Sequence, residues 1–262
     1  MPTAKKGLKQ AVYSFAVFAV WMLIWWVLSI AVGMEAILPS PLSCLKALVA
    51  MLPQKSFYVA VLYTLGRIIS GYVIGCLAGA LLGAIAYFVP ILGAFLRPFM
   101  SVVRATPVVS FALLAWLWLS PLGVPVLISS LMVIPVVFGN VCAGLENHSP
   151  QLREVAYVYG FSPTECLKNL FLPAVIPYFS AGCLTALGLS WKAGVAAEML
   201  VVTEKSIGMG LYDSKQYFEH ADLFAWTAVA VMLSFLFEWI VKLIAKKSGN
   251  KKALSSERAG NA

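Results

Sequence analysis

Charged residues are scarce in this chain. Asp, Glu, Lys and Arg make up only 11% of its 262 residues, whereas a soluble domain normally contains about a quarter. Hydrophobic residues reach 61%, and the mean hydropathy is +0.88. A globular interior cannot bury this much apolar side chain, so we expect a lipid bilayer to surround most of the chain. The net charge of +8 comes mainly from basic residues at both ends and beside the hydrophobic runs. That distribution is typical of a membrane protein and not of a nucleic-acid-binding one.

The sequence also lacks the residue patterns of catalysis and metal binding. It contains no G-x-x-x-x-G-K-[ST] loop, so the chain cannot be a P-loop ATPase. No nucleophile–base pair stands out, and the two histidines, His148 and His220, are far apart. The cysteines are odd in number, scattered and mostly inside apolar runs, at positions 44, 76, 142, 166 and 183. We therefore predict no enzyme activity, no catalytic residue, no metal site and no cofactor in this chain.

Long apolar runs define the membrane spans. About 20 apolar residues are needed to cross the hydrocarbon core. Six segments meet this need, at about 11–32, 64–89, 91–119, 124–145, 174–200 and 223–243. Pro107 and Pro135 lie inside these runs and are expected to kink or unwind their helices. The predicted fold is an all-α membrane protein with six transmembrane helices, forming a single domain over residues 1–262 with a disordered tail at 248–262.

The first span has an alternative interpretation as a cleaved signal peptide, because several lysines precede it. Its uncharged run, Ala11–Val32, is longer than the roughly 7 to 15 residues of a signal-peptide core, and no clear cleavage site follows. Six spans place both termini on one side of the membrane. That side also receives most of the basic residues, including Arg97 and Arg104 between the second and third spans, so we expect it to be cytoplasmic.

The second span contains four glycines spaced by four residues, Gly71, Gly75, Gly79 and Gly83. Residues four apart share one helix face. A face without side chains allows another membrane helix to approach closely. The pattern predicts tight helix packing, either within the chain or between subunits.

An insert at residues 146–173 separates the fourth and fifth spans, and its hydropathy is lower. Ser149-Pro150 predicts a helix start, and Leu152, Val155, Ala156 and Tyr159 form one apolar stripe. Gly160 follows where a helix end favours positive φ. The sequence Ser162-Pro163-Thr164-Glu165 then predicts a capping box. A short amphipathic helix of this kind is suited to dock in a partner's groove, although a plain hairpin between two spans is the alternative.

The same insert resembles a known family. Permease subunits of binding-protein-dependent ATP-binding-cassette importers have the pattern E-A-A, three residues, G, nine residues, I-x-L-P. This chain has Glu154-Val155-Ala156, Gly160 and Leu170-Phe171-Leu172-Pro173 at the same spacing. Val155 and Leu170 are conservative departures. The segments Leu38-Pro39-Ser40-Pro41 and Arg104-Ala105-Thr106-Pro107, with the glycine series, resemble the nitrate, sulfonate and taurine branch.

This resemblance implies a fold, partners and a substrate class. It implies the type I importer (MetI-like) arrangement in a bacterial cytoplasmic membrane, as a permease homodimer with no bound nucleic acid. Its partners would be cytoplasmic ATPase subunits, which bind ATP and Mg, and an extracytoplasmic substrate-binding protein. The substrate would be a small anion such as a sulfonate or nitrate, or a vitamin-precursor-like solute. The coupling helix would seat in the ATPase subunit, and the residues assigned to coupling are Glu154, Val155, Ala156, Tyr159, Gly160, Leu172 and Pro173.

Two charges lie inside the fifth span, Lys192 and Glu198. Intramembrane ionisable residues usually face the bundle interior or a water-filled path. The hypothesis is that Trp191, Lys192 and Glu198 line the translocation pathway, with Lys192 favouring an anionic solute. The alternative is that both charges lie near the outer mouth, or pair with residues of other helices.

Two other functions compete with the importer permease. A partner-independent secondary transporter predicts inverted repeats and paired broken helices, and the sequence shows no repeat. An integral membrane enzyme predicts polar catalytic residues clustered at one interface, and only Lys192 and Glu198 would be available for this.

Overall fold

The computed structural model describes residues 2–147 and 150–260, and these residues form helices joined by short turns. The proline and glycine punctuation of the sequence coincides with most of the helix ends. In chain order the helices are α1 (Pro2–Val32), α2 (Pro41–Met51), α3 (Lys55–Phe88), α4 (Pro90–Ala105), α5 (Val108–Trp116), α6 (Val124–Glu146), α7 (Pro150–Val158), α8 (Pro163–Cys166), the π-helical turn η1 (Leu167–Phe171), α9 (Leu172–Leu200), α10 (Ile207–Gln216) and α11 (His220–Gly260).

Five helices of the described chain are long and apolar enough to cross a membrane, and a bent pair, α4 with α5, makes a sixth candidate span. Where the sequence predicts one span at 91–119, the structure has two helices bent by 97°. Thr106 and Pro107 are extended at the break, with ψ angles of 132° and 133°. Proline disfavours helix in the residue before it and donates no N–H, which explains the break. α6, by contrast, continues through Pro135.

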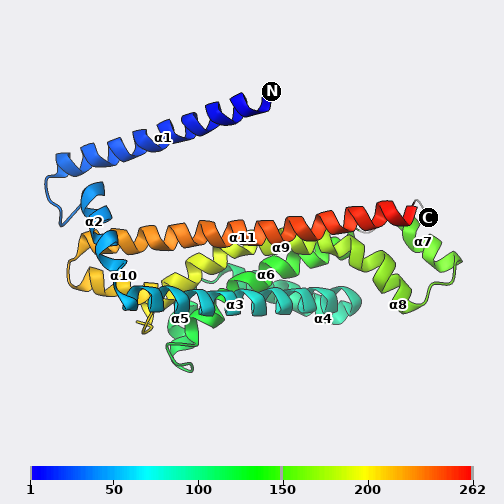
Figure 1. Ribbon diagram of the computed structural model, residues 1–262. Helices are drawn as coiled ribbons and strands as arrows, with labels where there is room; N and C mark the ends of the chain where they lie inside the picture. The colour runs from blue at the N-terminus through cyan, green and yellow to red at the C-terminus, as the bar shows by residue number, and fades with distance from the viewer. Residues whose placement is uncertain (1, 148–149, 261–262) are drawn as a thin grey trace.

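The long helices α3, α6, α9 and α11 run side by side, with α2 and α10 at one end of this bundle and α7 and α8 at the other (Figure 1). We call the end with α7 and α8 the insert end, and the end with α2 and α10 the α10 end. α1 stands apart from the bundle (Figure 1) and is exposed along its apolar length. Trp21, for example, is 64% exposed. Such side chains are stable only in a lipid or protein environment.

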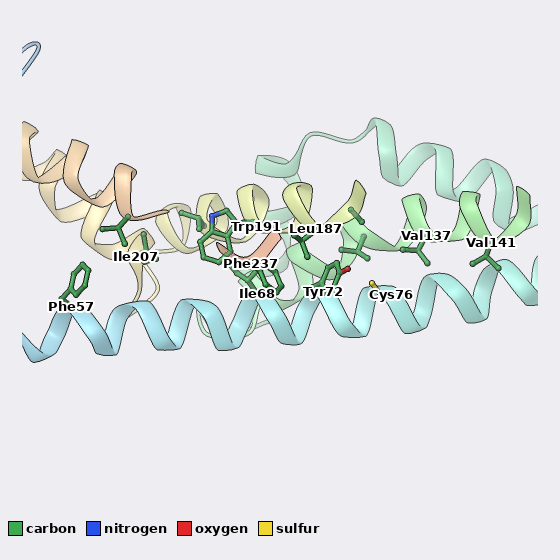
Figure 2. Packing of buried hydrophobic residues seen from close by; sticks show 14 of the residues in the cluster. Phe57, Ile68, Tyr72, Cys76, Val137, Val141, Leu187, Trp191, Ile207 and Phe237 are labelled. Atoms are coloured by element: carbon green, nitrogen blue, oxygen red, sulfur yellow. The ribbon is translucent and has the colours of Figure 1, made fainter. Parts of the chain in front are cut away.

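The closest packing in the core is between α3 and α6, with α9 against α6 on another side. The four glycines at 71, 75, 79 and 83 all face α6, so this packing is within one chain. A Cβ atom built on any of them would come within 2.5–3.0 Å of α6 atoms. Figure 2 shows Tyr72 and Cys76 of α3 along the same contact as Val137 and Val141 of α6.

The last helix, α11, extends into the end of the chain. It runs to Gly260, and residues 261–262 lie outside the described part of the chain. The tail is polar and contains no proline, and lysine, alanine and glutamate are good helix formers. Extending an existing helix needs no new nucleation.

Candidate functional site

The insert forms a helix, a glycine turn and a second helix. α7 ends at Val158, and Gly160 has a φ of +65° with no atom within 4 Å of an added Cβ. The Phe161 N–H donates to the Ala156 carbonyl at 2.9 Å. This bond closes the helix in the way a C-terminal glycine allows. The predicted start at Ser149 lies outside the described residues.

The second helix of the insert has the predicted capping box. The Glu165 N–H donates to the Ser162 hydroxyl at 3.3 Å, and the Ser162 N–H donates to the Glu165 carboxylate at 2.8 Å. η1 follows and passes directly into α9 at Leu172-Pro173. Pro173 cannot donate to the carbonyl four residues before it. The wider π-helical turn lies where that helical bond would be missing. Leu172 and Pro173 therefore lie at the junction between the insert and the fifth span.

α7 lies at the insert end (Figure 1), and several of its apolar side chains are exposed. Val155 is 47% exposed and Tyr159 is 76% exposed, with Val158 and Glu154 also exposed. Ala156 is buried, so only part of the predicted stripe faces outward. The side chain of Leu152 lies outside the described part of the structure.

A buried ion pair joins α9 to α3 near the α10 end. Glu198 is fully buried, and its carboxylate accepts from Arg67 Nη1 at 3.1 Å and from the Thr64 hydroxyl at 2.8 Å. Arg67 also donates through Nη2 to the carbonyl of Glu204 at 3.1 Å. The Gly208 N–H points at the same carboxylate, 3.4 Å away. These bonds fix the connection between α9 and α10 to α3.

The three residues proposed for the pathway lie on different sides of α9. Trp191 is 3% exposed, and its indole N–H donates to the carbonyl of Ala230 at 3.0 Å. Glu198 belongs to the buried ion pair. These two side chains are therefore packed inside the chain, contrary to the prediction that they line a path, and the alternative of pairing between helices holds for Glu198. Lys192 is exposed and shares a helix face with Thr185 and Leu189.

A cavity lies on that same face of α9, between α9 and α6. Its volume is about 590 Å³, which is within the usual range for small-molecule sites. Its polar residues are Arg104, Asn140 and Thr185, and the remainder of the lining is apolar. Arg104, in the last turn of α4, donates through Nη2 to the carbonyl of Pro135 at 3.0 Å. The cavity therefore combines one cation with an amide and a hydroxyl.

Residues 71–249 match the family model described as the binding-protein-dependent transport system inner membrane component. This region is more than half of the chain. The chain belongs to this family.

The permease also resembles curated transport proteins. It is 30% identical over 171 residues to the nitrate import permease protein NrtB of Synechococcus elongatus, covering 62% of this chain and 58% of that protein. It is 24% identical over 231 residues to the putative aliphatic sulfonates transport permease protein SsuC of Bacillus subtilis, covering 87% of this chain and 83% of that protein. Both resemblances agree with the branch that the sequence motifs indicate.

A solved structure supports the fold. A chain of a bacterial ABC transporter involved in the import of the acidic polysaccharide alginate matches with a TM-score of 0.63 at 16% identity. The match covers 92% of this chain and 98% of that one. The permease therefore has the all-α, type I importer fold, and it is a multi-pass inner membrane transport component and not an enzyme.

Sequence reasoning missed two features of this site. Arg67 and Thr64 gave no signal, because their partner Glu198 is more than 100 residues away and only the helix packing reveals it. The sequence predicts that Arg104 lies near the cytoplasmic interface, and it gives no sign that Arg104 contacts Pro135, the central residue of α6. The α3–α4 turn is at Val89, and α4 carries Arg104 to the middle of α6.

Proposed function

We propose that this permease is the transmembrane subunit of an ATP-driven importer for a small anion such as nitrate or a sulfonate. Two copies would form the translocation pathway. Separate cytoplasmic ATPase subunits would bind ATP and Mg and drive the permease, and an extracytoplasmic binding protein would deliver the solute. Both termini would be cytoplasmic. Family membership supports the general role, and the geometry of α7 supports the site of coupling.

The observation that carries the coupling proposal is the exposed apolar surface of α7. Val155, Val158 and Tyr159 are exposed at the insert end, in a part of the chain with low hydropathy. Exposed apolar residues on a short helix are typical of a helix that inserts into a partner's groove. Gly160 and the Ser162–Glu165 capping box connect α7 to the continuous helix that runs from Pro163 through α9. A movement of the ATPase subunits would thus be transmitted to α9.

An anionic substrate is favoured by the permease's relatives and by its charges. The two relatives are named for nitrate and for aliphatic sulfonates. Nitrate and the sulfonate group are both oxyanions with a single negative charge. Arg104 places a positive charge in the cavity, and Lys192 lies further along the same face of α9. A vitamin-precursor-like solute would not need either charge.

The coupling proposal is tested with variants of the glycine turn and the docking helix. In Gly160→Val, a β-branched residue must adopt a φ of +65°, which costs about 1–2 kcal/mol and should turn α7 away from its docking angle. In Glu154→Lys, the charge on the exposed face of α7 is reversed. We expect both variants to insert into the membrane normally and to lose at least about tenfold of the ATP hydrolysis stimulated by the binding protein.

The matched control is Gly188→Ala in α9. Gly188 also has no atom within 4 Å of an added Cβ, but its backbone is helical, so alanine should be tolerated. The measurement is ATP hydrolysis and solute uptake by the full complex in proteoliposomes. Undiminished stimulation in both Gly160→Val and Glu154→Lys would show that α7 is not the coupling helix.

A further inference from the structure

We propose that the cavity between α6 and α9 is an anion-binding site halfway along the translocation pathway, in which Arg104 contacts the transported oxyanion. The inference rests on the proposed function and extends it by naming the residues that meet the solute. Asn140 and Thr185 supply the further polar contacts. The expected ligand class is a small anion with a single negative charge, such as nitrate or the head group of an alkylsulfonate.

The first argument is that Arg104 has no counter-charge. In the described part of the chain, its hydrogen bond is the one from Nη2 to the carbonyl of Pro135, and no carboxylate pairs with it. A guanidinium has five N–H donors. Two other arginines of the bundle are paired, Arg67 with Glu198 and Arg97 with Glu146. An unpaired charge among membrane helices is expensive unless it faces water or a ligand.

The second argument is the depth of the cavity. Pro135 is the central residue of α6, and Thr185 lies near the centre of α9. Arg104 is near the end of α4, about 20 Å from its start at 1.5 Å per residue. The 97° bend after α4 ends the helix at that depth. Three separate chain segments thus bring their polar groups to the middle of the bundle.

The third argument is the chemistry of the lining. A guanidinium is planar and matches the geometry of planar or trigonal oxyanions. Asn140 uses one side-chain N–H for the carbonyl of Val136, at 2.8 Å, and keeps a second. The Thr185 hydroxyl now donates to the carbonyl of Ala181 at 3.0 Å and can rotate toward a ligand. One cation with few strong donors gives weak binding, which transport requires because the solute must leave again.

Lys192 extends the same path. It lies seven residues after Thr185 on α9, so it is on the same helix face and about 10 Å further toward the α10 end. Its side chain is exposed. An anion entering from the α10 end would therefore meet Lys192 before Arg104.

The experiment measures the charge preference of the cavity in the full complex in proteoliposomes. Thr185→Cys is treated with an anionic sulfonatoethyl methanethiosulfonate and with its cationic trimethylammonium counterpart, with and without ATP. Each rate is divided by that reagent's rate with a free thiol, and the background from the native cysteines is subtracted. We expect the anionic reagent to react at least about tenfold faster, because a cation lies nearby. Excess nitrate or methanesulfonate should slow the reaction more than chloride at equal ionic strength.

Variants of the cation and of the cavity shape complete the test. Arg104→Gln should remove the anion preference and Arg104→Lys should retain most of it. Gly139→Leu should slow both reagents, since the Gly139 position faces Arg104, with 3.7 Å between an added Cβ and Nη2. The matched control is Thr227→Cys on α11, an exposed threonine with the same hydrogen bond to the carbonyl four residues before it. It should show no anion preference.

Three results would overturn the site: the same anion preference in Arg104→Gln, a cation preference, or no reaction of Thr185→Cys with either reagent in both nucleotide states. Failure of the coupling proposal is read separately, from ATP hydrolysis in the Gly160 and Glu154 variants. If those variants lose stimulated ATP hydrolysis as expected, but Thr185→Cys shows no anion preference, only the anion site is rejected. An anion preference in complexes whose stimulation is insensitive to α7 rejects only the coupling helix.

Discussion

Glycines packed at two faces of α6 show how differently this bundle treats one residue type. On the face toward α3, the glycines belong to α3 and leave no space, because a Cβ on Gly75 would lie 2.6 Å from the Cβ of Val133 in α6. On the face toward the cavity, a Cβ on Gly139 would have Arg104 Nη2 as its neighbour, at 3.7 Å. The first face is closely packed, and the second borders the cavity.

The arginines follow the same division. Arg67 is buried with Glu198, and their hydrogen bonds are directed to each other and to the α9–α10 connection. Arg104 borders the open cavity and donates to a carbonyl. An intramembrane charge therefore indicates function only after its partner is known. Glu198, the residue that the sequence singled out, belongs to the structural side.

The largest effect on stability is expected from breaking the buried ion pair between Arg67 and Glu198. Glu198→Ala leaves the Arg67 charge buried without a counter-charge, and removing one member of a buried ion pair costs about 3–5 kcal/mol of folding free energy. The double variant Arg67→Met with Glu198→Leu should be more stable than Glu198→Ala. Thermal unfolding of the purified permease in detergent measures both. Equal stability of Glu198→Ala and the unmodified chain would contradict the structural role of the pair.

A medium effect is expected from filling the glycine face. Gly75→Leu forces α3 away from α6 and should cost about 1–3 kcal/mol or more. Gly139→Leu, the matched change on the cavity face, should leave the unfolding temperature nearly unchanged. The same unfolding measurement compares the two. A similar loss in both variants would show that the cavity face is packed as tightly as the α3 face.

The smallest effect on stability is expected from Arg104→Met. This change removes one hydrogen bond to the Pro135 carbonyl from a side chain that is exposed to the cavity, so it should cost no more than about 1.5 kcal/mol. Solute uptake by the complex should nevertheless fall strongly. A loss of stability as large as that of Glu198→Ala would show that Arg104 has a structural role.

Local sequence signals were sufficient for the features that depend on neighbouring residues. Gly160 has the positive φ that its position predicts, and Ser162 and Glu165 form the predicted capping box. Pro107 breaks its span as predicted, whereas α6 continues through Pro135. The glycine series predicted close packing but left its partner open, because a smooth helix face fits any neighbour.

The roles of the charged residues depended on distant contacts. The sequence assigned Trp191, Lys192 and Glu198 to a pathway because two of them are charges inside one span. Only the structure shows the neighbours that Trp191 and Glu198 contact. The sequence places the turn before α4 and the break at Pro107, but the contact of Arg104 with the middle of α6 depends on how α4 packs and is seen only in the structure.

By itself, the sequence determined that this chain is embedded in a bilayer, that its spans are helical and that a capped insert separates two of them. These properties follow from composition and from bonds between near neighbours. Only the tertiary structure decided that α3 closes on α6, that Glu198 is neutralised by Arg67 and that Arg104 faces a cavity. The physical reason is that the cost of a charge or a missing side chain inside a membrane depends on the atoms packed beside it, and those atoms come from other helices.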